Sequence, residues 1–216
     1  MRYSLFFTLM VCSILFAQSQ EIAPFADEVE AIQKKYDTLW DASKETIVFT
    51  GSSSIRIWHD IQDRFPDHQI VNSGFGGSQA SNLLDNCQEL VLRFKPRKVF
   101  IYEGDNDISA GKKTKEIIGD ILAIIAEIRA QDATTEIVLI AAKPSLARWN
   151  LKRDYKRLNR KFRKLSRKDV QMDYADVWKP MLNGKKVKED LFIEDGLHMN
   201  TKGYDIWFEV LEPHVK

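Results

Sequence analysis

Thr46-Ile-Val-Phe-Thr-Gly51 is the stretch that decides the fold. Its five β-branched or aromatic residues end at a glycine, which is typical of a buried parallel strand that runs into a loop. Comparable runs recur along the chain and predict four more strands. These strands cover Gln69–Val71, Lys98–Tyr102, Glu136–Ala141 and Val170–Tyr174.

Segments with helical periodicity precede, separate and follow these strands. In the first of them, apolar residues recur at steps of three and four with charges between, which predicts an amphipathic helix. The predicted helices are Phe25–Trp40, Ser78–Phe94, Thr114–Ala130, Asn150–Ser166 and Thr201–Leu211. Strands that alternate with helices of this length indicate a parallel sheet covered on both faces, with functional groups beyond the carboxyl ends of its strands. Asn183-Gly184 predicts a tight turn.

Composition limits the class of protein. The 216 residues are 44% hydrophobic and 29% charged, which suits one globular domain. Because 32 Lys and Arg stand against 31 Asp and Glu, the summed charge gives no case for nucleic acid or an anionic membrane surface. Cys12 and Cys87 are too few for a disulfide scaffold and lack the neighbours of a zinc cluster, so no metal site is predicted.

The N-terminal segment reads as an export signal. Arg2 precedes an apolar run, Leu5–Ala17, which ends in small and polar residues. A membrane-spanning helix needs about 20 apolar residues, so the run is too short to span. We predict a signal peptide at residues 1–19, a single domain at residues 20–216, and a secreted or periplasmic protein without stable membrane insertion. A buried first helix or an uncleaved anchor is the alternative.

One predicted helix is strongly basic. Between Lys152 and Lys168 there are ten Lys or Arg and a single acid, Asp154. Leu151, Tyr155, Leu158, Phe162 and Leu165 step along the same stretch at helical spacing. The cations therefore cover the solvent face of a docked helix or, alternatively, contact a polyanion.

Unusual polar or glycine-rich clusters follow the first three predicted strands, and a fourth lies near the C-terminus. The clusters are Gly51-Ser-Ser-Ser-Ile55, Asn72-Ser-Gly-Phe-Gly-Gly77, Glu103-Gly-Asp-Asn-Asp107 and Asp195-Gly-Leu-His198. Taken singly, the second resembles half of a dinucleotide motif and the third a calcium loop. Gln79 stands where the dinucleotide motif needs its third glycine, and Ala110 where the calcium loop needs its turn glycine.

In their order and spacing, the four clusters resemble the blocks of the SGNH or GDSL hydrolase superfamily, from about Thr46 to the C-terminus. The resemblance implies a three-layer α/β/α fold with a five-stranded, flavodoxin-like parallel sheet. It also implies a serine esterase that needs no cofactor or metal. Two positions depart from the family pattern, because Ser52 and Ser78 stand where Asp is usual.

The chemistry of acyl transfer assigns roles to these residues. Ser53, in the third position of the first block, is the expected nucleophile, and His198 is the expected base. His198 is the one histidine with an acid three residues before it, Asp195, which can orient the imidazole. The expected oxyanion donors are the backbone N–H groups of Ser53 and Gly77 and the side-chain amide of Asn106.

We expect short acyl esters, acetyl first, of a small molecule or a glycan, because no apolar insertion remains to form a lid or a long acyl tunnel. Arg148 and Trp149, after the fourth strand, are expected to face the alcohol side of the substrate. Plain packing of Trp149 is the alternative. A catalytically silent relative that binds a glycan or cell-wall fragment in the same cleft is the alternative function.

Overall fold

The structure of the chain is a computed structural model, and it describes residues 25–216. Five strands form one parallel sheet in the order β2-β1-β3-β4-β5, and β6 and β7 form a small hairpin. The strands are β1 (Thr46–Gly51), β2 (Gln69–Gly74), β3 (Lys98–Tyr102), β4 (Glu136–Ile140), β5 (Met172–Ala175), β6 (Leu182–Asn183) and β7 (Lys186–Val187). The predicted signal peptide lies outside the described residues.

Helices connect the strands. The longer ones are α1 (Ala26–Leu39), α7 (Thr114–Gln131), α8 (Lys152–Ser166) and α9 (Thr201–Val215). The shorter ones are α2 (Ser53–Arg56), α3 (Ile61–Arg64), α4 (Ala80–Asp85), α5 (Cys87–Leu90) and α6 (Asp105–Ser109). Three 3₁₀ turns complete the set, η1 (Leu92–Phe94), η2 (Trp149–Leu151) and η3 (Glu189–Leu191).

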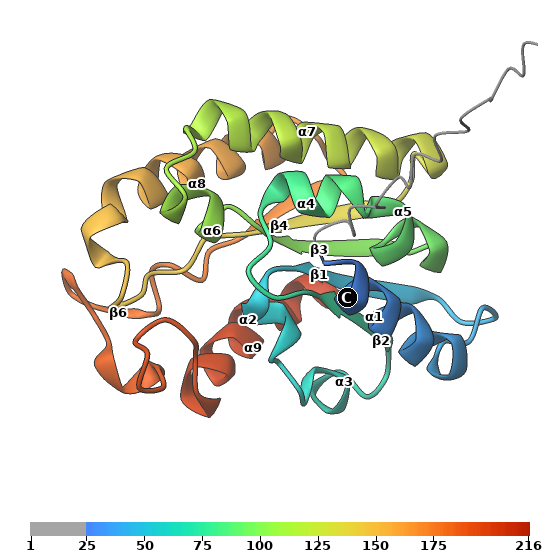
Figure 1. Ribbon diagram of the computed structural model, residues 1–216, viewed down its shortest axis with the longest axis horizontal. Coiled ribbons are helices and arrows are strands. Elements are labelled where there is room, and N and C mark those ends of the chain that lie inside the picture. The colour runs from blue at the N-terminus through green and yellow to red at the C-terminus, as the bar shows by residue number, and fades with distance from the viewer. Residues whose placement is uncertain (1–24) are drawn as a thin grey trace, which may run out of the picture.

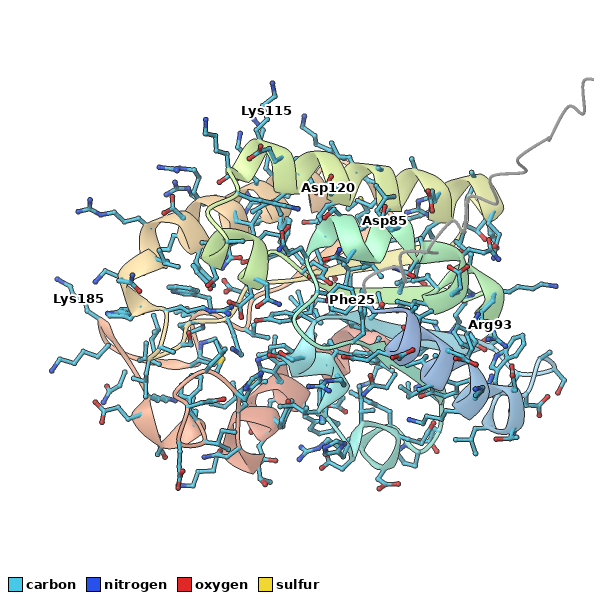
Figure 2. The ribbon with its side chains drawn as sticks, viewed as in Figure 1. Phe25, Asp85, Arg93, Lys115, Asp120 and Lys185 are labelled. Atoms are coloured by element: carbon cyan, nitrogen blue, oxygen red, sulfur yellow. The ribbon has the colours of Figure 1, made fainter. Side chains whose placement is uncertain are left out.

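The helices cover both faces of the sheet. Figure 1 shows α4, α7 and α8 on one face and α1 and α9 on the other, so the fold has three layers. The strand order is that of a flavodoxin-like sheet, as predicted. Every residue of β1 and β3 is buried because these central strands have a strand on each side and helices above and below. Lys115 and Lys185 instead point away from the body (Figure 2).

The predicted helix over residues 78–94 is wrong as a single element. Three short pieces, α4, α5 and η1, replace it, with breaks at Asn86 and Val91. The Asn86 side chain donates to the carbonyl of Asn82 at 2.8 Å, a local bond that competes with the backbone hydrogen bonds of a continuous helix. The predicted bounds of the other elements differ by a few residues, the largest change being the extension of α9 from Leu211 to Val215.

Two smaller features complete the fold. The turn predicted at Asn183-Gly184 is confirmed, because it joins β6 to β7 with Gly184 in the left-handed region, at φ 59°. No helix among residues 25–216 combines the length and the apolar character needed to cross a membrane.

Candidate active site

The turn after β1 delivers a serine to the carboxyl edge of the sheet. Gly51 adopts φ 122°, and a Cβ there would lie 2.1 Å from the carbonyl oxygen of Tyr102 on β3. Only glycine fits this close approach between neighbouring strands. The chain then turns sharply, and Ser53 becomes the first residue of α2.

Three predicted residues form a hydrogen-bonded row at this edge. The Oγ of Ser53 lies 2.9 Å from Nε2 of His198, and Nδ1 of His198 lies 2.5 Å from Oδ2 of Asp195. Because the carboxylate accepts the Nδ1 proton, Nε2 is left as the acceptor that faces the serine hydroxyl. The two loops that supply the row are 145 residues apart in the chain. This geometry is that of a serine hydroxyl beside an oriented base.

Asp195 is held in its ionised form. Burial acts to raise its pKa, but the Leu197 N–H at 2.8 Å, the His198 imidazole and the His198 N–H at 2.9 Å outweigh burial and lower the pKa to about 2. The carboxylate therefore stays charged at neutral pH, where it can stabilise a positive charge on the imidazole.

The neighbouring serines have other partners. The Ser52 hydroxyl accepts from the Asn106 side chain at 2.6 Å, and Ser54 is buried, with its carbonyl accepting from the Tyr204 hydroxyl at 2.9 Å. Of the three adjacent hydroxyls, that of Ser53 is the one bonded to His198.

Two backbone N–H groups are free to act as donors. Neither the N–H of Ser53 nor that of Gly77 has a hydrogen-bond acceptor within residues 25–216. Gly77 is exposed with φ 73°, and a Cβ there would have no neighbouring atom within 4 Å. The adjacent N–H, of Gly76, is instead bound by Glu28 of α1 at 2.7 Å. Glu28 thus anchors the glycine loop, a role that sequence analysis missed.

Asn106 has an amide that is fixed at both ends. Its nitrogen donates to the Ser52 hydroxyl at 2.6 Å and to the Ser78 carbonyl at 2.8 Å. Its oxygen accepts from the Arg148 guanidinium at 3.0 Å. Because guanidinium only donates, it fixes which end of the amide faces the serines. An incoming oxyanion has to share or replace the Ser52 hydroxyl as the acceptor.

Arg148 and Trp149 have internal partners. The Arg148 guanidinium bonds Asp105 at 2.6 Å as well as Asn106, and its side chain is 19% exposed. Trp149 is half-buried, with its ring stacked on Trp178 at 5.9 Å between centroids. The Lys152 ammonium also lies over the Trp149 ring, 4.8 Å from its centroid, so the packing alternative accounts for much of the ring. Arg148 is positioned to act on Asn106.

A buried ionic cluster lies beneath these groups. Asp105 accepts from the hydroxyls of Tyr102, at 2.8 Å, and Tyr155, and the fully buried Lys143 lies 3.5 Å from it. Burial acts to raise the Asp105 pKa, but the charges of Lys143 and Arg148 outweigh it and lower the pKa. Lys143 also donates to the Leu197 carbonyl at 2.7 Å, so it ties the His198 loop to Asp105. A lysine directly after a buried strand was the sequence signal for this tie, and sequence analysis did not use it.

Asp107 also links two loops. Its carboxylate accepts from the N–H groups of Ala80 and Gly104, each at 3.2 Å, and lies 3.5 Å from Lys112. The acids of this block thus bind protein donors, and residues 25–216 contain no cluster of three or more His, Cys, Asp or Glu arranged to hold a metal ion.

Glu103 explains the departure from the family pattern at Ser78. Its fully buried carboxyl accepts from the Ser78 hydroxyl at 2.7 Å. Burial raises the pKa of Glu103 well above its usual range, and the nearby charges of Asp107 and Asp105 raise it further. An Asp at position 78 would place a second buried carboxyl against this one, whereas a serine hydroxyl donates to it.

We expect Glu103→Gln to stabilise the protein increasingly as the pH rises from 5 to 8. A raised folded-state pKa means that the contribution of Glu103 to stability is greatest at low pH and falls once a glutamate of the unfolded chain ionises, above about pH 4.3. Glutamine keeps the acceptor for Ser78 and does not titrate. Urea unfolding at both pH values measures the effect, with the exposed Glu209→Gln as control. If the free energy of unfolding of the Glu103 variant differs from that of the wild type by the same amount at both pH values, Glu103 ionises normally.

The chain resembles solved structures over most of its length. It superposes, with a TM-score of 0.77 and 25% identity, on a Streptococcus pneumonia protein that is provisionally described as a platelet activating factor. The match covers 88% of this chain and 94% of that one. On a GDSL-like lipase from Bacteroides thetaiotaomicron it superposes with a TM-score of 0.71 and 19% identity, covering 85% of this chain and 96% of that one. On a carbohydrate esterase family 3 protein from Talaromyces cellulolyticus it superposes with a TM-score of 0.63 and 17% identity, covering 79% of this chain and 96% of that one.

No curated protein matches the chain. The model of the GDSL-like lipase/acylhydrolase family matches residues 37–206 of the chain. This range contains all four clusters that converge at the carboxyl edge of the sheet. The chain therefore belongs to the GDSL-like lipase/acylhydrolase family and is a hydrolase of ester bonds.

Proposed function

We propose that the chain is an exported serine esterase that removes short acyl groups, acetyl first, from a polar alcohol such as a sugar hydroxyl. The observation that carries the proposal is the row Ser53–His198–Asp195, with 2.9 Å and 2.5 Å between its heteroatoms. An activated hydroxyl of this kind attacks an ester carbonyl directly.

Acylation uses the three residues in sequence. Ser53 Oγ attacks the carbonyl carbon while His198 Nε2 takes the hydroxyl proton, and Asp195 stabilises the resulting imidazolium. Collapse of the tetrahedral intermediate breaks the bond to the alcohol, which leaves with the proton from Nε2. Water then attacks the acyl-serine by the same route, which releases the acid and restores Ser53.

Three donors are the candidates to stabilise the negative charge that develops on the carbonyl oxygen. The free N–H groups of Ser53 and Gly77 point to an oxyanion site, and Asn106 supplies a third donor once its bond to Ser52 yields to the oxyanion. A neutral serine at position 52 competes less for this amide than a carboxylate would. The exchange favours the transition state, where the oxyanion is charged, over the neutral ground state.

Two aliphatic side chains beside His198 are the candidates to contact the acyl group. Leu146 and Ile193 are exposed aliphatic side chains on the two loops that flank His198, at 41% and 50% exposure. A Cβ on Gly196 would lie 3.1 Å from Leu146, and the Ile193 N–H donates to the His198 carbonyl at 2.9 Å. Two such side chains can contact an acetyl to butyryl group. A carbohydrate esterase among the structural neighbours supports a sugar as the alcohol.

On p-nitrophenyl esters of increasing length, kcat/KM is expected to peak between acetyl and butyryl and to fall steeply beyond. Trp149→Ala is expected to weaken turnover of acetylated sugars more than that of p-nitrophenyl acetate, because a tryptophan face binds a sugar ring better than it binds the small ester. Trp40→Ala, a half-buried tryptophan beside Thr46 at the opposite end of β1, is the control for packing loss. A peak at long chains, or equal losses on both substrates, rejects this assignment.

Fluorophosphonate labelling separates the esterase from the silent relative. The reagent needs an activated serine, so it should label the wild type and leave Ser53→Ala unlabelled. An unlabelled wild type that still binds glycan would favour the binding protein.

We also propose export, on the basis of the Arg2 charge and the Leu5–Ala17 run. N-terminal sequencing of the protein from its native host is expected to start between Gln18 and Glu21. Intact Met1 on soluble intracellular protein would overturn the export proposal.

A further inference from the structure

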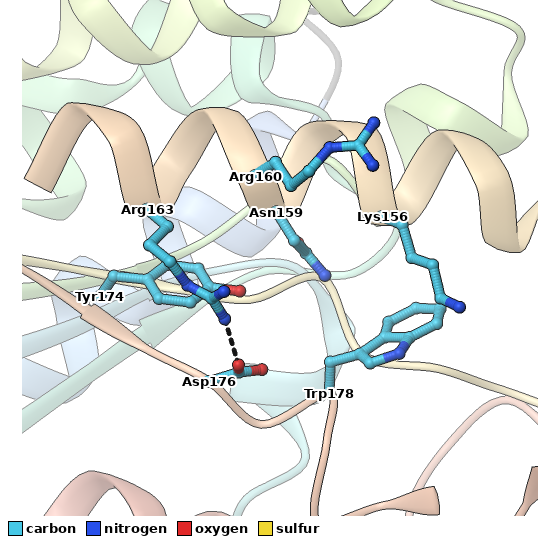
Figure 3. A pocket seen from close by; sticks show the side chains of 7 residues that line it. All are labelled: Lys156, Asn159, Arg160, Arg163, Tyr174, Asp176 and Trp178. Carbon is cyan, nitrogen blue, oxygen red and sulfur yellow. Dashed lines mark hydrogen bonds and ion pairs between the residues drawn. The ribbon is translucent and has the colours of Figure 1, made fainter. Parts of the chain in front are cut away.

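A charged pocket lies between α8 and β5, the edge strand of the sheet (Figure 3). Its volume is about 200 Å³. Sites for drug-sized ligands start at about 300 Å³, so this pocket suits one sugar ring or one charged group. The lining residues are Lys156, Asn159, Arg160, Arg163, Tyr174, Asp176 and Trp178.

The pocket has an excess of positive charge. Arg163 forms an ion pair with Asp176 and lies over the Tyr174 ring, 5.0 Å from its centroid. In Figure 3 Lys156 reaches towards Trp178, whereas the Arg160 guanidinium turns away from Asp176 and Trp178. Neither cation forms an ion pair within residues 25–216. Asn159 is occupied by the N–H and carbonyl of Ala142. The lining therefore offers one free cation, Lys156, beside Trp178, and a second, Arg160, at the rim.

The positive charge of the pocket is part of an uneven distribution of charged residues along the chain. Residues 152–168 hold ten basic side chains and one acid, whereas the rest of the sequence holds 22 basic and 30 acidic side chains. A helix surface whose charges serve only to keep the protein soluble carries acidic and basic side chains interspersed. Cations concentrated on one helix attract an anionic partner to it.

The pocket is close to the candidate active site. Trp178, which forms one wall, stacks on Trp149, and Trp149 follows Arg148 in the chain. The Arg148 guanidinium contacts Asn106. The pocket is thus linked to Asn106 through the Trp178–Trp149 stack, the chain neighbours Trp149 and Arg148, and the bond from Arg148 to Asn106.

The burial of α8 argues for a soluble polyanion over a membrane. Tyr155, Leu158 and Phe162, its apolar residues, are buried in the core. A helix that lies on a lipid surface inserts its apolar face into the lipid, and here that face is unavailable.

We propose that this pocket is a subsite for the carboxylate or sulfate group of an acidic glycan that carries the ester on a neighbouring sugar. Lys156 binds the anionic group, Arg160 at the rim adds to the attraction, and the Trp178 wall borders the sugar. The substrate class rests on the proposed function, since a sugar hydroxyl is taken as the alcohol. Anion binding in the pocket does not depend on it.

The first experiment measures binding without catalysis. Unesterified oligogalacturonate is titrated into the wild type by calorimetry, since it contains no ester to hydrolyse. Lys156→Gln/Arg160→Gln is expected to weaken binding at least about tenfold, and added salt is expected to weaken wild-type binding. Lys161→Gln/Lys164→Gln removes the same charge from the same helix outside the pocket and is expected to change little.

Equal losses in both double variants would overturn the subsite, because they would show general attraction to the helix. Equal binding of a neutral oligosaccharide of the same length would also overturn it. So would a preference for phosphatidylglycerol vesicles or single-stranded DNA over oligogalacturonate.

The second experiment separates the subsite from the esterase. The pocket variant should raise KM for acetylated oligogalacturonate and leave p-nitrophenyl acetate and neutral acetylated sugars unchanged. A wild type that binds oligogalacturonate through the pocket but hydrolyses none of these esters would overturn the proposed function and retain the anion site. An active enzyme whose KM for the acidic ester is unaffected would overturn the subsite alone.

Discussion

Ser53→Ala is expected to remove nearly all esterase activity, with kcat falling on the order of 10⁶-fold, as in other serine hydrolases that lose the nucleophile. His198→Ala is expected to have a similar effect, because the hydroxyl at 2.9 Å is then without a base. The double variant should cost little more than either single variant, since the two groups act as a unit. Asp195→Ala should be milder, because the base itself remains, although it loses the carboxylate that orients it and stabilises its charge. Steady-state kinetics on p-nitrophenyl acetate measures all four.

Ser52→Ala and Ser54→Ala are the matched controls, since each removes a neighbouring hydroxyl that does not touch His198. Both should retain fluorophosphonate labelling. Full activity in Ser53→Ala together with loss in either control would assign the nucleophile to another serine.

Asn106→Ala is expected to lower kcat by roughly 10²–10³ with little change in KM, which is the effect of removing one donor that acts mainly in the transition state. The fold should survive, because the amide is half-buried and binds only Ser52, Ser78 and Arg148. Thermal unfolding checks this. A rise in KM at constant kcat would make Asn106 a residue that binds substrate.

Arg148 provides the test of how that donor is oriented. If its guanidinium acts through Asn106, Arg148→Ala lowers kcat in the wild type and has little further effect in the Asn106→Ala background. Both bonds of Arg148 come from one guanidinium nitrogen, Nη1, so Arg148→Lys should restore activity only if the lysine ammonium reaches both Asp105 and Asn106. The sequence prediction that Arg148 contacts the alcohol makes a different forecast, a higher KM for acetylated sugars in both backgrounds.

The sheet could be predicted from the sequence because its central strands are buried on both faces. Such strands are continuous apolar runs, and the one at residues 98–102 has the same bounds in the structure. The helix predicted at residues 78–94 fails for a local reason that periodicity does not register. Its apolar spacing is helical, but the side chain of Asn86 bonds the backbone in place of a helical turn.

The candidate site could be predicted as far as it depends on short motifs. Asp195 and His198 are three residues apart, so their contact is readable from the sequence. The partners of Arg148 are not, because Asp105 lies 43 residues away and the contact exists only once β3 and β4 pair. The same holds for Lys143 and Leu197, which are 54 residues apart.

The buried Asp105 cluster has a consequence for how this enzyme evolves. One carboxylate fixes Arg148, which orients Asn106, and holds Lys143, which secures the His198 loop. A substitution at Asp105 would leave Lys143 uncompensated in the core and would loosen both sides of the site at once. Many enzymes can exchange activity for stability by mutation. A substitution at Asp105 lowers activity and stability together, so selection for turnover also preserves the stability of this part of the fold.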